Sequence, residues 1–155
     1  MKAVTRLAQL IGRQPWLTAV GPRIVNADIR LQRWTGGRIS FGRLAGLRSV
    51  TMTTTGRRTG QPRLAPLIAI PDGDCLLLVA SNFGRPHHPH WSANLIANPN
   101  ATAQINGHDF AVTATLLTGE DREQAWKTVT TSWPAYHDYQ ARAAREIRVF
   151  RVTRR

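Results

Sequence analysis

Cysteine is almost absent from this 155-residue sequence, which contains Cys75 alone. A single thiol cannot form a disulfide within the chain, so the fold has to be stable through its core. A chain of this length buries about two-thirds of its unfolded surface and folds without cross-links. Cys75 lies in the apolar run 75–80 and is interpreted as a small core residue. We therefore expect one domain, residues 1–155, in a reducing, cytoplasmic environment.

Long apolar runs are also absent. The N-terminal apolar stretch is broken by Arg13, Gln14 and Pro15 and lacks a small-residue cleavage pattern, so it is not expected to be a signal peptide. No run approaches the roughly 20 apolar residues that a helix needs to span a bilayer. The sequence therefore predicts no transmembrane helix.

Acidic residues are few, because nine Asp and Glu residues accompany 21 Lys and Arg residues and leave a net charge of +12. Residues 1–63 contain 12 of the basic residues and a single acid, Asp28, for a net charge of +11. Such a field attracts polyanions, which include nucleic acid, an anionic lipid surface and a charged cofactor. The charge alone does not choose among these three partners.

The densest positive segment is residues 56–63, which hold three arginines and two glycines between two apolar runs. Glycine lets main-chain N–H groups approach a ligand closely, and guanidinium groups match phosphate or carboxylate oxygens in pairs. The segment predicts an anion-binding loop built on Arg57, Arg58 and Arg63. A solvated hairpin turn would explain the same composition.

The N-terminal residues 1–34 have the pattern of basic amphipathic helices. Apolar residues recur at helical spacing over residues 3–13 and again over 16–34, where Gly21-Pro22 is expected to interrupt the helix. Thr35-Gly36-Gly37 is typical of a helix stop. Such helices suit an anionic membrane surface, and they also suit a cap on a barrel. Both interpretations stay open.

Beyond residue 37 the apolar period changes to two, which predicts strands. Asn106-Gly107 is a strong hairpin signal, Pro71 to Asp74 has turn composition, and Thr118 is placed to cap a helix. Six or so mostly antiparallel strands with marginal helices predict a mainly β, α+β fold and a small barrel. The expected strands are 49–55, 63–70, 75–80, 101–105, 110–117 and 147–152, and the expected later helices are 118–132 and 134–145.

Residues 81–91 combine polar and aromatic side chains after the buried strand 75–80. Three histidines, His87, His88 and His90, suggest a metal site, but no carboxylate or thiol stands at ligand spacing and the first two are adjacent, so no metal is expected. Trp91 opens a short helix and is explained equally well as a core residue.

Three blocks of this sequence resemble the deazaflavin-dependent nitroreductase and quinone reductase family of actinobacteria. They are Thr53-Thr54-Thr55-Gly56-Arg57-Arg58-Thr59-Gly60-Gln61-Pro62-Arg63 with Pro66-Leu67; Ser81-Asn82-Phe83-Gly84 with Pro89-x-Trp91-x-x-Asn94-Leu95-x-Ala97-Asn98-Pro99; and Trp133-Pro134-x-Tyr136-x-Asp138-Tyr139-Gln140. The resemblance implies a flavin-reductase-like split β-barrel that binds coenzyme F-420, a 5-deazaflavin with a phosphate and an oligoglutamate tail. A polyanionic ligand of this kind gives the arginine loop a purpose.

The same resemblance implies roles for individual residues. The loop positions hold the phosphate and the tail, and the others border the deazaflavin ring. The implied cofactor-binding residues are Arg57, Arg58, Thr59, Arg63, Pro66, Ser81, Asn82, Phe83, Gly84, His90 and Trp91. The implied substrate-binding residues are Trp133, Tyr136 and Tyr139, and the candidate proton donors are Tyr136, Ser81 and Tyr139.

The sequence departs from the family pattern at several positions. Many relatives have Lys-Gly-Gly where this chain has Asn82-Phe83-Gly84, a tyrosine where Ser92 stands and a proline where Arg148 stands. The lost lysine removes one cation from the cofactor site. For the two tyrosines, core packing is the alternative to a substrate role.

The function that the resemblance implies is hydride transfer from reduced coenzyme F-420 to a small planar acceptor, such as a quinone, an enone or a nitroaromatic. Three alternatives stay open at this point. One is a split barrel that binds FMN instead, the second is a member that carries cofactor or lipid without catalysis, and the third is a basic nucleic-acid-binding protein. The N-terminal helices add a possible peripheral contact with the inner face of the cell membrane.

Overall fold

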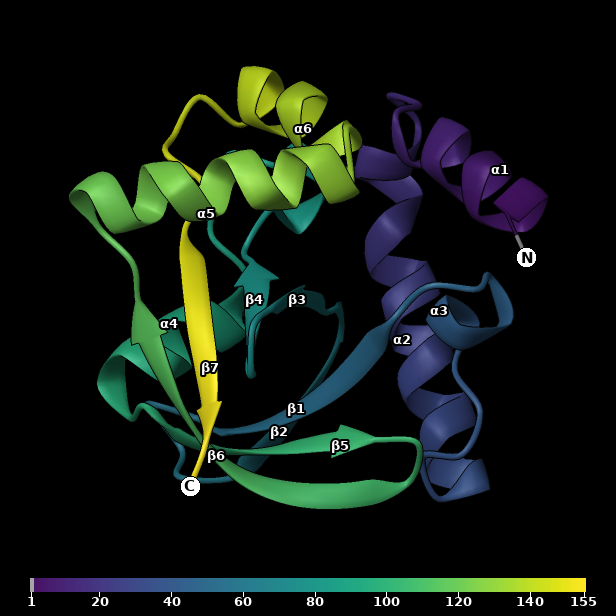
Figure 1. Cartoon of the computed structure of the whole chain (residues 1–155). Coiled ribbons are helices and arrows are strands. Elements are labelled where there is room, and N and C mark those ends of the chain that lie inside the picture. The colour runs from purple at the N-terminus through teal and green to yellow at the C-terminus, as the bar shows by residue number, and fades with distance from the viewer. Residues whose placement is uncertain (1) are drawn as a thin grey trace.

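A computed structural model of the chain describes the backbone of residues 2–155 and the side chains of residues 6–155. Its centre is a seven-stranded sheet that curls on itself, in the order β2-β1-β5-β6-β7-β4-β3 (Figure 1). Every neighbouring pair is antiparallel, which confirms the mainly β architecture with flanking helices. The strands are β1 Ser49–Thr55, β2 Pro62–Ile68, β3 Ile70–Asp72, β4 Cys75–Val79, β5 Asn100–Ile105, β6 His108–Leu116 and β7 Val149–Arg154.

The helices lie around this sheet. In Figure 1, α5 and α6 lie across one end of it, α2 and α3 lie to one side, and α1 extends outward near α6. Their bounds are α1 Lys2–Gly12, α2 Leu17–Thr35, α3 Phe41–Leu44, α4 His90–Ala97, α5 Gly119–Ser132 and α6 Ala135–Ala143, with a 3-10 turn η1 at Asn82–Gly84.

Two apolar clusters form the core, and β4 contributes to both. Leu78 faces the first cluster, inside the curl of the sheet, where Trp91 of α4 packs on Phe150 with ring centroids 5.6 Å apart. Leu77 and Val79 face the second cluster, under α5 and α6. Successive strand side chains point to opposite faces, so the continuous apolar run 75–80 is explained by burial on both sides.

Local turn chemistry predicted several boundaries correctly. Asn106 and Gly107 both have positive φ, at 55° and 81°, and join β5 to β6 as a tight hairpin. Gly36 ends α2 in the left-handed conformation with φ 61°, and its N–H bonds to the carbonyl of Gln32.

Three expectations were wrong in detail. The turn after β3 is shorter than expected, because Pro71 and Asp72 pair within the sheet and only residues 73–74 turn. Thr118 occupies the N-cap position of α5, but its side chain makes no capping hydrogen bond. The chain also adds a short strand, β3, to the six expected.

The helix α2 continues through Gly21-Pro22 instead of breaking there. Proline removes one backbone hydrogen bond near the N-terminal end of the helix, where the loss is least disruptive. Gly21 packs against the ring of Phe83, and a Cβ at Gly21 would lie 2.5 Å from Phe83 Cδ2. This glycine thus permits the close packing of α2 on the Asn82–Gly84 turn.

Candidate functional site

The arginine loop joins β1 to β2 and is closed by its own backbone. Thr54 pairs with Arg63 in the register of the two strands. The N–H of Gly56 donates to the carbonyl of Gln61 at 2.8 Å, and the N–H of Gly60 donates to the carbonyl of Gly56 at 2.7 Å. Gly60 has φ 67°, a conformation that glycine adopts without strain. The closed turn leaves the side chains of residues 57–59 exposed.

Helix α4 holds this loop through one buried amide. Asn94 Oδ1 accepts a hydrogen bond from the backbone N–H of Arg57 at 3.1 Å, and Asn94 Nδ2 donates to Thr54 Oγ1 at 3.1 Å. Asn94 is only 3% exposed. Buried side-chain amides cost free energy unless both ends are paired, and this one is paired at both ends to the loop and its strand. The loop is therefore fixed in position while its arginines stay free to meet a ligand.

The loop guanidinium groups have no carboxylate partner among the described side chains. The ion pairs of the structure join Arg13 to Asp138, Arg122 to Glu146 and Arg151 to Asp72, all away from the loop. Within the loop, Arg63 Nη2 donates to Thr59 Oγ1 at 3.3 Å. A set of donors without internal anions is the chemistry that binds phosphate or carboxylate groups.

The turn Asn82–Gly84 has three successive residues with positive φ, at 48°, 56° and 77°. This conformation is uncommon for a bulky residue such as Phe83 and costs on the order of 1–3 kcal/mol per residue. Contacts hold it in place: Phe83 packs on Gly21 and meets the edge of Tyr139 at a centroid distance of 6.4 Å. A Cβ at Gly84 would lie 3.1 Å from the backbone of Tyr139. Strain of this kind is characteristic of functional turns.

Arg145 anchors the chain on both sides of that turn. Its guanidinium donates to the carbonyl oxygens of Ala80, Ser81 and Arg85 at 3.1 to 3.3 Å, and its Nη1 lies 3.0 Å from Nδ1 of His88. Burial, and after it the nearby arginines, lower the pKa of His88, so this imidazole is neutral at pH 7.

The three histidines do not form a metal site. His87 and His90 are exposed, and His88 faces a guanidinium group. Over the residues that the structure describes, no three His, Cys, Asp or Glu side chains converge as metal ligands would.

The aromatic residues predicted to bind substrate lie together in the second core cluster. Trp133, Tyr136 and Tyr139 are each less than 7% exposed, and the two tyrosine rings meet edge to face at 6.0 Å. Burial is the main cause that raises the pKa of both phenols, to about 12 for Tyr139. Both hydroxyl groups therefore keep their protons throughout the physiological range.

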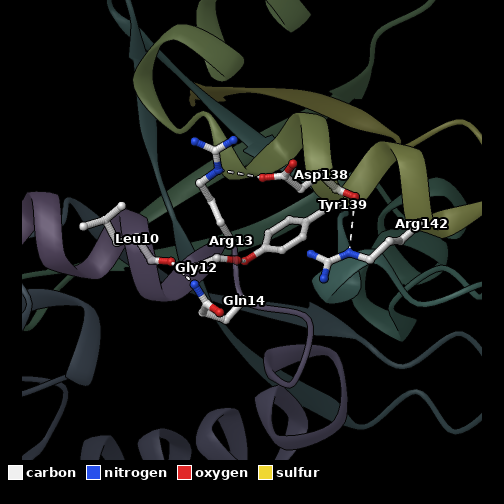
Figure 2. A network of polar contacts seen from close by, with 7 residues as sticks. All are labelled: Leu10, Gly12, Arg13, Gln14, Asp138, Tyr139 and Arg142. Atoms are coloured by element: carbon white, nitrogen blue, oxygen red, sulfur yellow. Dashed lines mark hydrogen bonds and ion pairs between the residues drawn. The ribbon is translucent and has the colours of Figure 1, made fainter.

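The two tyrosines differ in the hydrogen bonds of their hydroxyl groups, and Figure 2 shows the surroundings of Tyr139. The Tyr139 hydroxyl donates to the carbonyl of Gly12 at the end of α1, at 2.5 Å. Beside it, Arg13 pairs with Asp138 at 2.9 Å, and the Arg142 guanidinium lies 5.3 Å from the Tyr139 ring. No hydrogen bond joins the Tyr136 hydroxyl to another side chain within residues 6–155. Tyr139 thus helps to dock α1, whereas the Tyr136 hydroxyl makes no hydrogen bond with residues 6–155.

A sequence model of the F420H(2)-dependent quinone reductases matches residues 25–154 of this chain, from the middle of α2 to the end of β7. This protein belongs to that family. It is therefore an oxidoreductase of the kind that depends on coenzyme F-420, as the three sequence blocks predicted. The family description gives no support to FMN as the cofactor.

Individual relatives agree with this assignment. An F420H(2)-dependent quinone reductase of Mycobacterium tuberculosis is 36% identical over 144 residues, which cover 90% of this chain and 97% of the relative. A solved F420-H2 dependent reductase is 38% identical, has a TM-score of 0.62 and aligns with 68% of this chain and 93% of its own. A solved domain-swapped dimer is 34% identical with a TM-score of 0.64, over 79% of this chain and 93% of its own. The fold of this reductase is accordingly a split β-barrel.

The residues of this reductase fit a polyanionic deazaflavin. Arg57, Arg58 and Arg63 supply unpaired guanidinium groups on a loop that Asn94 fixes. Near the Asn82–Gly84 turn, Nη2 of Arg142 is buried with no hydrogen-bond partner among the described residues. A buried, unsatisfied donor is expected where a ligand atom completes its hydrogen bonds.

The structure places the predicted site residues in two groups. The loop residues and Pro66 lie on the β1–β2 hairpin, with His90 and Trp91 at the start of α4 beside it. Ser81 to Gly84 lie against Tyr139 of α6, and Trp133 and Tyr136 are beneath them in the second cluster. The family resemblance assigned no role to Asn94 or Arg145. Asn94 lies in the second of the three resembling segments, but only the folded chain shows what its amide contacts.

Proposed function

We propose that this reductase transfers a hydride from reduced coenzyme F-420 to a quinone. The observation that carries the proposal is the family match over residues 25–154, joined with an arginine loop that has no carboxylate partner in the described structure. The proposal extends to this chain the acceptor class that its relatives are named for.

The loop and its neighbours bind and orient the cofactor in this proposal. Arg57, Arg58 and Arg63, with Thr59, hold the phosphate and the tail, and each charge-assisted hydrogen bond contributes roughly 1.5–3 kcal/mol. The residues that would border the ring are Pro66, Ser81, Asn82, Phe83, Gly84, His90 and Trp91. When bound, a reduced deazaflavin supplies a hydride from its C5 carbon and avoids one-electron chemistry. The protein's own work is to orient a flat acceptor against the ring and to exclude water.

Proton supply is assigned to Tyr136 because its hydroxyl is not engaged elsewhere in the described structure. The raised pKa keeps this phenol protonated, so it can donate a hydrogen bond to an acceptor oxygen as negative charge develops there. Tyr139 uses its hydroxyl to hold α1, and Ser81 or solvent would supply the proton if Tyr136 serves packing alone.

An acceptor screen tests the proposal. Purified protein and reduced coenzyme F-420 are mixed with a quinone, an enone or a nitroaromatic, and the recovery of deazaflavin absorbance near 420 nm is followed. We expect the quinone to give the highest kcat/KM. Oxidation no faster than in protein-free controls with every acceptor would instead favour a cofactor carrier without catalysis.

We also propose that the N-terminal helices touch an anionic membrane surface, where apolar quinones dissolve. Leu7 and Leu10 on α1 are 58% and 60% exposed, Trp16 is 52% exposed, and Trp34 on α2 is 87% exposed. Arginines surround these apolar side chains, the combination that binds helices in the interface plane. Within the described residues, no helix has the length and hydropathy to cross a bilayer. A peripheral contact is the form that these features support.

A further inference from the structure

A groove of about 430 Å³ lies between α2 and the start of β2, outside the loop that the sequence motif identifies. Its volume is within the range of small-ligand sites. Three of its lining residues are arginines, and two of these belong to α2. The lining residues are Asn26, Ile29, Arg30, Arg33, Pro62, Arg63 and Leu64.

Helical spacing and a buried network orient the arginines of α2. Positions 26, 30 and 33 are four and three residues apart, so they share one face of the helix. The opposite side faces the sheet: Asp28 is 6% exposed and accepts from Gln32 Nε2 at 2.9 Å and from the backbone N–H of Phe41 at 2.7 Å. The Gln32 amide oxygen in turn accepts from the hydroxyl of Thr51 on β1. The network fixes the rotation of α2 and holds Arg30 and Arg33 at the groove.

The positive charge of the groove is not neutralised within the protein. Asp28 is the only acid in residues 1–63, and its carboxylate is committed to the network on the other side of α2. Among the side chains of residues 6–155, no ion pair involves Arg30, Arg33 or Arg63. Three guanidinium groups thus line one open groove, and they favour a ligand with several negative charges.

Arg63 belongs both to the anion-binding loop and to this groove. The groove thus offers an anionic chain held at the loop a path from Arg63 toward Arg33 and Arg30, with Ile29 and Leu64 as apolar lining. We propose that the groove binds the oligoglutamate tail of the cofactor, with Arg30 and Arg33 as tail ligands that the motif does not include. This inference rests on the proposed function, because it assumes that the deazaflavin occupies the neighbouring site.

Titration with two ligands tests the proposal. Dissociation constants are measured by fluorescence for coenzyme F-420 with its tail and for the same deazaflavin ending at the phosphate. The variants are the double substitution Arg30→Ala/Arg33→Ala and the charge-matched control Arg23→Ala/Arg38→Ala, whose exposed arginines do not line the groove.

We expect the groove variant to bind the tailed cofactor at least tenfold more weakly and the truncated one within twofold of the unchanged protein. The control should change neither constant by more than twofold. In the unchanged protein, the tailed cofactor's affinity should fall steeply with salt, and in the groove variant the slope should be shallower.

Three results would overturn the proposal. If the ratio of the two dissociation constants is the same in the groove variant and in the unchanged protein, the tail does not lie in the groove and the proposed function stands. If neither ligand binds the unchanged protein, the proposed function fails with it. If vesicles of anionic phospholipid compete with the tailed cofactor and the groove variant loses only vesicle binding, the groove is a lipid headgroup site.

Discussion

Arg63 is the residue on which the account of cofactor binding depends most. It is the second residue of β2, donates to Thr59 within the loop and lines the groove beside α2. Arg63→Ala should raise the dissociation constant of coenzyme F-420 about tenfold or more, since it removes one or two charged hydrogen bonds. The effect should shrink toward 1 M salt, where the Debye length is about 3 Å. Calorimetric titration at two salt concentrations measures both. Unchanged affinity in a folded variant would remove the loop from the site.

Tyr136 tests whether the protein supplies a proton from a side chain. Tyr136→Phe keeps the ring that packs in the second cluster and deletes the hydroxyl alone. If the phenol donates the proton, turnover with a quinone should fall by roughly 10²-fold while the affinity for the cofactor stays the same. Since the pKa is raised, ionisation of this residue should not appear in the pH profile of the unchanged enzyme below about pH 10.

Two further substitutions, Tyr139→Phe and Tyr136→Ala, show whether a loss of turnover in Tyr136→Phe comes from proton supply or from packing. Tyr139→Phe should affect the docking of α1 more than turnover, because its hydroxyl bonds to Gly12. Tyr136→Phe could instead keep turnover within about twofold, which is a difference in activation free energy of under about 0.4 kcal/mol. If Tyr136→Ala then lowers both turnover and melting temperature, Tyr136 is a packing residue.

At the scale of elements, the same buried hydrogen bonds of Asp28 stabilise the fold and orient α2 beside the proposed site. Asp28→Ala leaves the N–H of Phe41 and the amide of Gln32 without their partner in a buried environment, so it should lower the free energy of unfolding by about 1–3 kcal/mol. Urea denaturation measures this change. Asp74→Ala is the control, because Asp74 is exposed and should change stability by no more than about 0.5 kcal/mol. Equal stability of the two variants would contradict the network.

Elements that local chemistry determines could be predicted from the sequence. The β5–β6 hairpin needs positive φ at two positions, which Asn106-Gly107 supplies, and the end of α2 needs the same at Gly36. The close packing of Gly21 on Phe83 could not be predicted, because the two residues are 62 positions apart. Gly21-Pro22 predicted an interruption because proline removes a backbone hydrogen bond, yet α2 continues through it.

Some residues of the candidate site could also be predicted from the sequence, and others could not. The arginine loop was recognisable, because charge, glycine and spacing lie within one short segment. The residues that hold the site in place were not recognisable, because their partners are distant in sequence. Asn94 bonds to Arg57, 37 positions away, and Arg145 bonds to the carbonyl of Ala80, 65 positions away. The groove at Arg30 and Arg33 likewise requires knowing which face of α2 the buried Asp28 occupies.

On the scale of the whole molecule, the exposed apolar side chains of α1 and the excess positive charge lie in the same N-terminal part of the chain. Leu7→Gln/Leu10→Gln removes the apolar contact and leaves intact the contacts of Gly12 and Arg13 with α6. We expect this variant to sediment much less with anionic vesicles, while its cofactor affinity and melting temperature match those of the unchanged protein.

Deleting residues 1–14 is a less informative change, because it also removes the hydrogen-bond partner of Tyr139 and uncovers Trp133, against which Gly12 packs. If the unchanged protein and Leu7→Gln/Leu10→Gln bind vesicles equally well, α1 is a cap on the barrel and not a membrane contact. Sedimentation with neutral vesicles separates the apolar contribution from the electrostatic one.

The central claim is that this split barrel uses reduced coenzyme F-420 to reduce a quinone, and one single-turnover measurement tests it most directly. Reduced cofactor is bound to excess protein, a quinone is added, and absorbance at 420 nm is recorded as the oxidised deazaflavin returns. We predict a protein-dependent return of absorbance that Arg63→Ala slows at low cofactor concentration. When reduced FMN replaces the deazaflavin, we predict no oxidation beyond the rate in protein-free controls. Tight binding of the reduced cofactor with no return of absorbance, or equal use of reduced FMN, would contradict it.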